Sequence, residues 1–138
     1  MLISHVLAPP MPRPTALKRP KDGPLLPLPV RWQCDLADDR LTWALGVFDL
    51  FGMDRAVRPE RRDVLARYLP ESRDALEQLR ADAIRLGQSF VLDTRIVRPD
   101  GDIRWMRITA DVLIRDGRVT HLYGQKQDRT DAFATDGA

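Results

Sequence analysis

The sequence predicts an α+β domain in which a five-stranded antiparallel sheet carries its helices on one face. Residues 90–128 alternate in polarity and are divided by two dipeptides, Asp100-Gly101 and Asp116-Gly117, which favour hairpin turns. Two short alternating segments also lie within residues 32–43, and residues 44–86 follow helical periodicity. Because no helical segment separates the last three strands, the sheet is expected to be antiparallel, and the helices must cover one of its faces.

Three helices are expected between the two groups of strands. Gly52 and Gly87 each follow an apolar periodic segment and suit a helix C-cap, because glycine adopts the left-handed conformation that ends many helices. Pro59 suits the first turn of a helix, where its missing N–H is not needed. The expected helices span residues 44–51, 59–68 and 71–86, and the last should bury Leu76, Leu79, Ala83 and Leu86.

The 138 residues divide into one domain and two terminal segments. Eight of the 11 prolines fall in residues 1–29, where they prevent a regular helix or central strand. This segment is expected to be a flexible basic tail, with a partner-binding polyproline segment as the sharper alternative. The folded domain is expected at residues 30–131 and a short C-terminal tail at 132–138.

Charge and composition argue against several classes of protein. The first 29 residues carry a net charge of +3, which leaves 18 basic and 19 acidic groups on the rest of the chain. A nucleic-acid-binding groove should be basic on the folded domain itself, so we expect no nucleic-acid partner. No apolar stretch is long enough to span a membrane, and the single cysteine, Cys34, fits a reducing cytoplasm.

Several short motifs, in order, resemble those of PAS domains, the sensor and docking modules of bacterial signalling, and in particular a PAS_3-like subgroup. They are Trp32-Gln-Cys-Asp-Leu36, Leu41-Thr-Trp43, Leu50-Phe-Gly52, Leu69-Pro-Glu-Ser-Arg73, Arg95-Ile-Val-Arg-Pro-Asp-Gly101, Arg104-Trp105 and Asp128-Arg-Thr130. The resemblance implies the PAS fold over about residues 32–131. In many relatives the last motif passes a signal into a following helix and effector. Because this chain ends eight residues after Thr130, it is expected to be a stand-alone protein whose output passes through another polypeptide.

One set of alternating strand residues should face the helices. The resemblance to flavin-binding PAS relatives places Ile96, Met106 and Lys126 where polar ring-contacting amides would lie, so their sets are assigned to the inner face. The candidate ligand cavity consists of Ile96, Met106, Leu122 and Lys126. An unpaired lysine head inside is costly. Lys126 must therefore reach solvent at the strand end, meet a carboxylate or meet an acidic ligand, and the first of these is favoured.

The opposite set of strand residues is too apolar for a freely solvated face. We expect a partner, a second copy or the Leu25–Leu28 segment to cover this outer face. The candidate interface residues are Val91, Trp105, Val119, His121 and Tyr123.

The sequence lacks the motifs that several cofactors and catalytic reactions require. Light-sensing relatives use a helical Asn-Cys-Arg-Phe-Leu-Gln-like motif, whereas Cys34 lies on the first strand, so flavin is disfavoured. Haem-sensing relatives use a histidine on the long helix, but the two histidines here are His5 and His121, so haem is disfavoured as well. One cysteine and two distant histidines form no zinc pattern, and no nucleophile, base and orienting group come together. An unidentified small ligand remains possible.

Three functions follow from these patterns. The first is a cytoplasmic PAS adaptor that binds a sensor histidine kinase, another PAS protein or a second copy of itself through the outer face. The second is a small-molecule sensor with an internal cavity, which is compatible with the first. A small α+β enzyme of unrelated ancestry is the remote alternative.

Overall fold

The computed structural model describes residues 27–137, and side chains as far as Phe133, so the expected flexible tail lies almost wholly outside the described residues. One antiparallel sheet with the strand order β2-β1-β5-β4-β3 forms the centre of the fold. The elements are β1 (Val30–Asp35), β2 (Arg40–Trp43), α2 (Leu45–Phe51), α3 (Arg61–Leu65), α4 (Pro70–Leu86), β3 (Phe90–Val97), β4 (Ile103–Arg115), β5 (Arg118–Asp128) and α5 (Thr130–Gly137).

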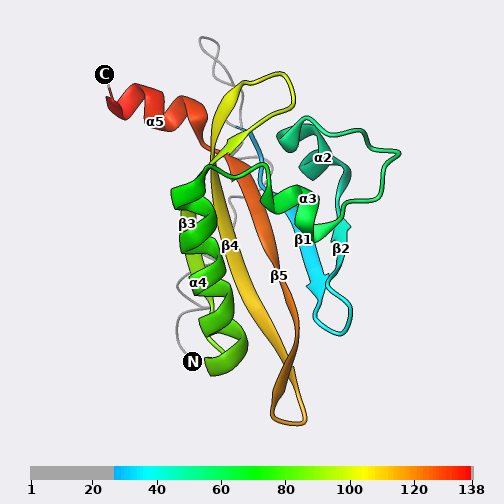
Figure 1. The fold of residues 1–138 in the computed structure, drawn as a ribbon. Coiled ribbons are helices and arrows are strands. Elements are labelled where there is room, and N and C mark those ends of the chain that lie inside the picture. Colours follow the sequence, from blue (N-terminus) through cyan, green and yellow to red (C-terminus); the bar gives the residue numbers. More distant parts are fainter. Residues whose placement is uncertain (1–26, 138) are drawn as a thin grey trace, which may run out of the picture.

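Helices α2, α3 and α4 lie on one face of the sheet, as Figure 1 shows, and the predicted architecture is therefore confirmed. The longest strands, β4 and β5, are joined by the Asp116-Gly117 turn, in which the two residues have φ angles of 51° and 78°. Positive φ at both central residues is what a tight two-residue hairpin requires. Among the described residues, no helix is long and apolar enough to cross a lipid bilayer.

The inner face predicted from strand alternation is the buried face over most of the sheet. Thr94 and Ile96 of β3 and Met106 and Ile108 of β4 are almost fully buried, as is Leu122 of β5. The helices supply Val47, Phe51, Val64 and Ala83 to the same core. Alternation in the strands thus identified which side of the sheet packs on the helices.

A register shift in the β4–β5 pair changes the faces near the hairpin. The pairing passes from Leu113 with His121 to Ile114 with Val119, so Thr120 is the extra residue on β5. An extra residue in one strand reverses the alternation beyond it. Val119 accordingly packs against the core cluster on the helix-bearing side, and its predicted place on the outer face is wrong.

The helices differ from the prediction at their ends. Helix α3 covers only Arg61–Leu65 within the expected 59–68 segment, because the following residues run beside β3. There the Arg67 carbonyl accepts a 2.7 Å hydrogen bond from Val97 N, and Tyr68 bridges to Ile96. Pro70 begins α4, and Leu86, expected to be buried, is exposed at its end.

A helix follows β5 where a short tail was expected. Helix α5 begins at Thr130, whose backbone N–H donates a 2.9 Å hydrogen bond to Asp128 Oδ1. A carboxylate in that position satisfies a free N–H group at the helix start. Figure 1 shows α5 leaving the sheet at the end opposite the β4–β5 hairpin.

Candidate functional site

A cavity of about 70 Å³ lies between the sheet and helices α3 and α4. Because one ordered water needs roughly 10–15 Å³ by this measure, the cavity has room for a small molecule. Strands β1, β2, β3, β4 and β5 all contribute to its walls. The lining residues are Trp32, Cys34, Leu41, Arg61, Val64, Leu65, Tyr68, Leu76, Arg80, Phe90, Ile108, Leu122 and Lys126.

Lys126 places an ionisable amine in the largely apolar wall of this cavity. It lies on β5 between Val30 of β1 and Ile108 of β4, so its stem starts from the middle of the sheet. The residue is only 7% exposed, and its Nζ donates a 3.1 Å hydrogen bond to Tyr68 Oη. The expectation that the lysine head reaches solvent at the strand end is therefore wrong.

Four aromatic rings surround the Lys126 head. Their centroids lie 5.4 Å (Trp32), 5.9 Å (Trp43), 5.0 Å (Phe51) and 5.8 Å (Tyr68) from Nζ. The rings of Trp43 and Phe51 stack at 5.1 Å, which fixes one wall of this box. Ring faces attract a cation within about 6 Å. The box therefore favours the ammonium form, whereas burial disfavours it.

Burial lowers the pKa of the Lys126 amine to about 7. Desolvation is the cause, because removing the ammonium from water penalises its charged form. The neighbouring Tyr68 hydroxyl is fully enclosed, and burial raises its pKa. Among the described side chains, Lys126 has this hydroxyl as its hydrogen-bond partner and has no ion pair.

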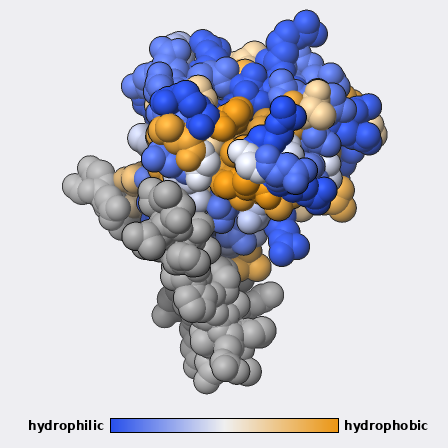
Figure 2. Space-filling view, turned by 90° about the horizontal axis from the view of Figure 1, so that it is seen from below, coloured by the Kyte–Doolittle hydropathy of each residue, from blue (hydrophilic) through white to orange (hydrophobic). Residues whose placement is uncertain are grey.

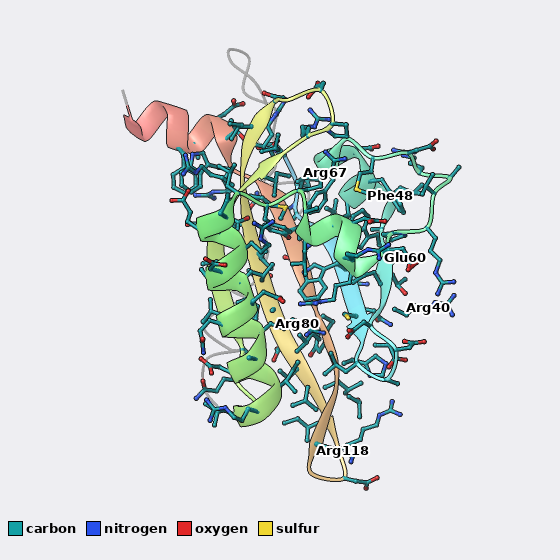
Figure 3. The ribbon with its side chains drawn as sticks, viewed as in Figure 1. Arg40, Phe48, Glu60, Arg67, Arg80 and Arg118 are labelled. Carbon is teal, nitrogen blue, oxygen red and sulfur yellow. The ribbon has the colours of Figure 1, made fainter. Side chains whose placement is uncertain are left out.

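Two arginines line the cavity from the helical layer. Arg61 of α3 pairs with Glu77 of α4, and Arg80 of α4 pairs with Asp39 of the β1–β2 turn at 2.8 Å. Figure 3 shows Arg80 extending from α4 toward β1 and β2. These pairs link α3, α4 and the β1–β2 turn around the cavity.

The one cysteine is also part of the cavity wall. Cys34 is buried on β1, and burial raises the pKa of its thiol, while the nearby Arg80 guanidinium lowers it. Since the thiolate is the reactive form, a raised pKa makes this cysteine a weak nucleophile. Cys34 therefore acts as part of the apolar wall.

The predicted cavity residues divide into two pairs. Leu122 and Lys126 line the cavity, whereas Ile96 and Met106 are fully buried in the core beside it and are not part of its lining. Contact of any of the four with a ligand stays a prediction. The sequence reasoning missed Trp32 and Tyr68 as neighbours of Lys126, and it missed Arg61 and Arg80 as parts of the same cavity wall. The signal for the aromatic residues was their inward position on strands and helix ends, but nothing local marks the arginines.

On the outer face, the predicted interface residues have different surroundings. Val91 and Tyr123 are 39% and 43% exposed. Trp105 packs on Phe133 of α5, with ring centroids 4.6 Å apart, and the Arg95 guanidinium lies 5.5 Å from the Trp105 ring. His121 is half-buried, with Nε2 3.5 Å from Asp35 Oδ2. Helix α5 thus covers part of the face that was expected to need a partner.

Only the last part of the Leu25–Leu28 segment belongs to the described residues. The Pro27 carbonyl accepts a 2.8 Å hydrogen bond from Gln127 Nε2. Leu28 remains 65% exposed. Leu28 therefore does not cover the apolar side chains of the outer face.

A second cluster of contacts joins β4 to the β5–α5 junction. Asp128 Oδ2 accepts a 2.9 Å hydrogen bond from Arg104, and Thr130 Oγ1 accepts a 3.0 Å hydrogen bond from Trp105 N. The Arg129 amide donates a 2.8 Å hydrogen bond to the Trp105 carbonyl. The Asp128-Arg-Thr130 motif therefore holds the start of α5 on the sheet.

Within residues 27–137, no three potential metal ligands of the histidine, cysteine or carboxylate types come together. The chemistry of the site thus consists of an enclosed amine, a hydroxyl, two guanidinium groups and apolar walls.

Comparison with known proteins identifies the class. The sequence pattern of the PAS fold family matches residues 40–125, and the chain belongs to this family. It is a PAS signalling domain, similar to the sensor domains of larger signalling proteins.

One curated relative and several solved structures are similar to the chain. The probable diguanylate cyclase DgcE of Escherichia coli (strain K12) is 30% identical over 101 residues, which are 72% of this chain and 9% of that protein. The N-terminal domain of a diguanylate cyclase with a PAS/PAC sensor from Marinobacter aquaeolei superposes with a TM-score of 0.70 at 19% identity and covers 77% of this chain and 99% of that one. A PAS domain from Colwellia psychrerythraea gives a TM-score of 0.60 at 15% identity, with 75% and 87% covered. This chain spans less than a tenth of the length of the curated relative.

Proposed function

We propose that this PAS domain is a sensor that binds a small molecule in the cavity beneath α3 and α4. The observation that carries the proposal is Lys126, a buried amine without an ion-pair partner among the described residues, at the wall of a cavity of about 70 Å³. A buried lysine lowers the stability of the folded state, so a purely structural core would be better served by an apolar residue. Strongly perturbed groups at concave sites are candidates for binding roles.

The position of Lys126 suits the transfer of a signal. It lies two residues before Asp128 on β5, and Asp128 caps α5 and pairs with Arg104. A ligand that draws the amine away from Tyr68 would displace β5 relative to the helical layer, and α5 starts directly at the end of that strand. The proposed output is therefore a change in how α5 lies on the sheet.

Native mass spectrometry after gentle purification tests the proposal. The expected result is a second species heavier than the bare chain by the mass of a small molecule. Leu76→Phe should remove that species, because Leu76 lines the cavity and a larger ring would fill it. The matched control is Leu79→Phe on the same helix, since Leu79 packs on the core without lining the cavity. If the unchanged protein shows the mass of the bare chain and no heavier species, the proposal of a retained ligand is contradicted.

A second candidate function is docking of another signalling protein, such as a histidine kinase or PAS protein, or of a second copy on the outer face. It is favoured by the exposure of Val91 and Tyr123 on the face of the sheet opposite α2, α3 and α4, where apolar side chains are available to a partner. Tyr123→Glu should weaken self-association or partner capture without unfolding the domain. Arg118→Glu in the exposed hairpin, labelled in Figure 3, is the control. Unchanged association of the Tyr123 variant in sedimentation velocity would argue against this surface.

A further inference from the structure

The charges around the cavity are all of one sign. Its lining contains Lys126, Arg61 and Arg80 but no aspartate or glutamate. The partners of the two arginines, Glu77 and Asp39, lie outside the lining and are partly exposed. Lys126, at the sheet, has no such partner among the described residues. Positive charge in the enclosed part of the cavity is therefore uncompensated.

The surroundings of Lys126 are suited to a cation that gains a counter-ion. Phe51 and Tyr68 lie on the helical side of Nζ and Trp32 lies on β1, and their ring faces attract positive charge. The Tyr68 oxygen accepts one of the three ammonium N–H groups, which leaves donors for a ligand. What the ammonium lacks is a negative group in reach, and a small carboxylate would supply one.

We infer that the cavity takes a compact organic anion, with an apolar body and one carboxylate whose oxygens accept hydrogen bonds from Lys126 Nζ. This inference rests on the proposed sensor function and names its ligand class. The apolar body would pack on Leu65, Leu76, Phe90 and Ile108, which offer no hydrogen-bonding side chains. A multiply charged anion fits poorly, because Arg61 and Arg80 are already paired with Glu77 and Asp39. The remaining hydroxyl and amine cannot replace the hydration of several charges in such a small space.

The anion should bind more tightly at lower pH. Burial lowers the pKa of Lys126 to about 7, so the amine loses its charge as the pH rises through neutrality. The other titratable or charged groups that line the cavity with it are Cys34 of β1, Tyr68 of the α3–α4 connection, Arg61 of α3 and Arg80 of α4. Burial raises the pKa of the thiol and of the hydroxyl, and arginines stay charged, so Lys126 alone among them changes charge near pH 7.

Calorimetric titration of the full chain with butyrate, benzoate and their uncharged amides tests the ligand class. Each amide matches its carboxylate in shape but cannot form the ion pair. We expect the carboxylate to bind about tenfold or more tightly than the amide at about pH 6.5, because a buried charge-assisted hydrogen bond exceeds a neutral one. Above the lysine pKa the carboxylate affinity should fall, approaching about tenfold per pH unit.

Two variants connect the preference to Lys126. Lys126→Met should remove the preference for the carboxylate, and Lys126→Gln, which keeps a polar head, should remove it as well. Arg118→Met deletes a charge from the exposed hairpin, and this variant should still prefer the carboxylate to the amide. Far-ultraviolet circular dichroism establishes that each variant is folded. In a separate measurement, bound butyrate should raise the pKa of Lys126, observed through its 13Cε resonance.

The proposal is overturned if neither carboxylate binds more tightly than its amide, or if the preference persists in both Lys126 variants. These results are distinct from failure of the sensor function. Amide binding that Leu76→Phe abolishes would retain the cavity as a ligand site and replace the anion with a neutral ligand. Failure of all four probes together with a bare mass in native spectrometry would remove both.

Discussion

Lys126 Nζ lies 3.1 Å from Tyr68 Oη, and this hydrogen bond joins the central strand β5 to the connection between α3 and α4. Tyr68 itself bridges to Ile96 of β3. The contact therefore spans the core from one part of the sheet to the helical layer and back to another strand. Because one of its partners titrates near neutral pH, the strength of this link depends on the protonation of Lys126.

Replacing Lys126 with methionine should stabilise the domain in a pH-dependent way. The folded-state pKa of about 7 lies below the ordinary value of 10.5, so the folded state binds fewer protons than the unfolded state between these two values. The loss of folding stability that the buried Lys126 causes is therefore greatest below about pH 7, and it becomes smaller as the pH rises toward 10.5. Lys126→Met should therefore exceed the wild type by a few kcal/mol in unfolding free energy at neutral pH, on the order expected for a shift of this kind.

Urea unfolding at several values of pH between 6 and 9 measures this difference. The gap between variant and wild type should narrow as the pH rises, because only the wild type carries the buried amine. Arg118→Met is the matched control. Its unfolding free energy should change with pH as that of the wild type does, since this charge lies in the exposed hairpin. A constant gap for Lys126→Met would show that its amine does not titrate in this range.

Tyr68→Phe should lower the pKa of Lys126 further. The ring remains as part of the aromatic box, but the oxygen that accepts the ammonium hydrogen is lost. Loss of a hydrogen bond to the charged form favours the neutral amine, and the domain should lose about 1 kcal/mol or somewhat more of stability. Titration of the lysine 13Cε resonance gives the pKa directly. Tyr123→Phe removes an exposed hydroxyl from the other face and should leave that pKa unchanged; equal effects of the two variants would contradict the role of Tyr68.

Local sequence determined most of what could be predicted of the fold. Alternation located the buried set from Thr94 to Leu122, because neighbouring strand residues must point to opposite faces. The Asp116-Gly117 turn and the glycine at position 52 were recognisable because each adopts a left-handed conformation that few residues tolerate. These features depend only on residues close in the chain.

The features that were missed depend on tertiary contacts. The side on which Val119 lies follows from a register shift with β4, and no local pattern marks it. The helix after β5 places Phe133 against Trp105 of β4, and the whole of β5 separates these two residues in the sequence. Likewise, Lys126 was recognised as unusual, but its aromatic box is assembled from β1, β2, α2 and the α3–α4 connection, whose proximity only the folded chain provides.

Gly124→Ala should destabilise the domain strongly. Gly124 lies on β5 between Trp32 and Ala110, and an added Cβ would lie 1.9 Å from the Thr109 carbonyl oxygen. Backbone atoms must move to relieve that overlap, so the expected loss is at the upper end of the roughly 1–3 kcal/mol of overpacking, or beyond it. Gly101→Ala is the control, because its φ of 90° strains an alanine although no atom lies within 4 Å of the added Cβ. Equal losses for the two in urea unfolding would contradict a steric requirement at position 124.

The apolar end of the molecule around the hairpin offers a separate test of the register shift. Figure 2, which views the molecule from this end, shows an apolar area surrounded by hydrophilic residues. A surface depression here is lined by Leu36, Ile84, Ile114 and Val119, among others. Because Val119 packs against the core, Val119→Asp should lower the stability by about 2 kcal/mol or more. Val91→Asp on the exposed outer face should lower the stability much less. Similar losses of stability for the two variants in urea unfolding would contradict the position of Val119 on the inner face.

Phe133→Ala should release α5 from the sheet while the domain stays folded. The Phe133 ring packs on Trp105 at 4.6 Å, and an isolated helix of eight residues is too short to persist in water without such a contact. Amide hydrogen exchange of residues 130–137 should therefore become much faster, whereas β4 and β5 keep their protection. Phe133→Leu, which retains an apolar contact, should give an intermediate rate. If the alanine variant exchanges like the wild type, the hydrogen bonds at Asp128 and Thr130 hold the helix alone, and the ring contact is not what keeps α5 on the sheet.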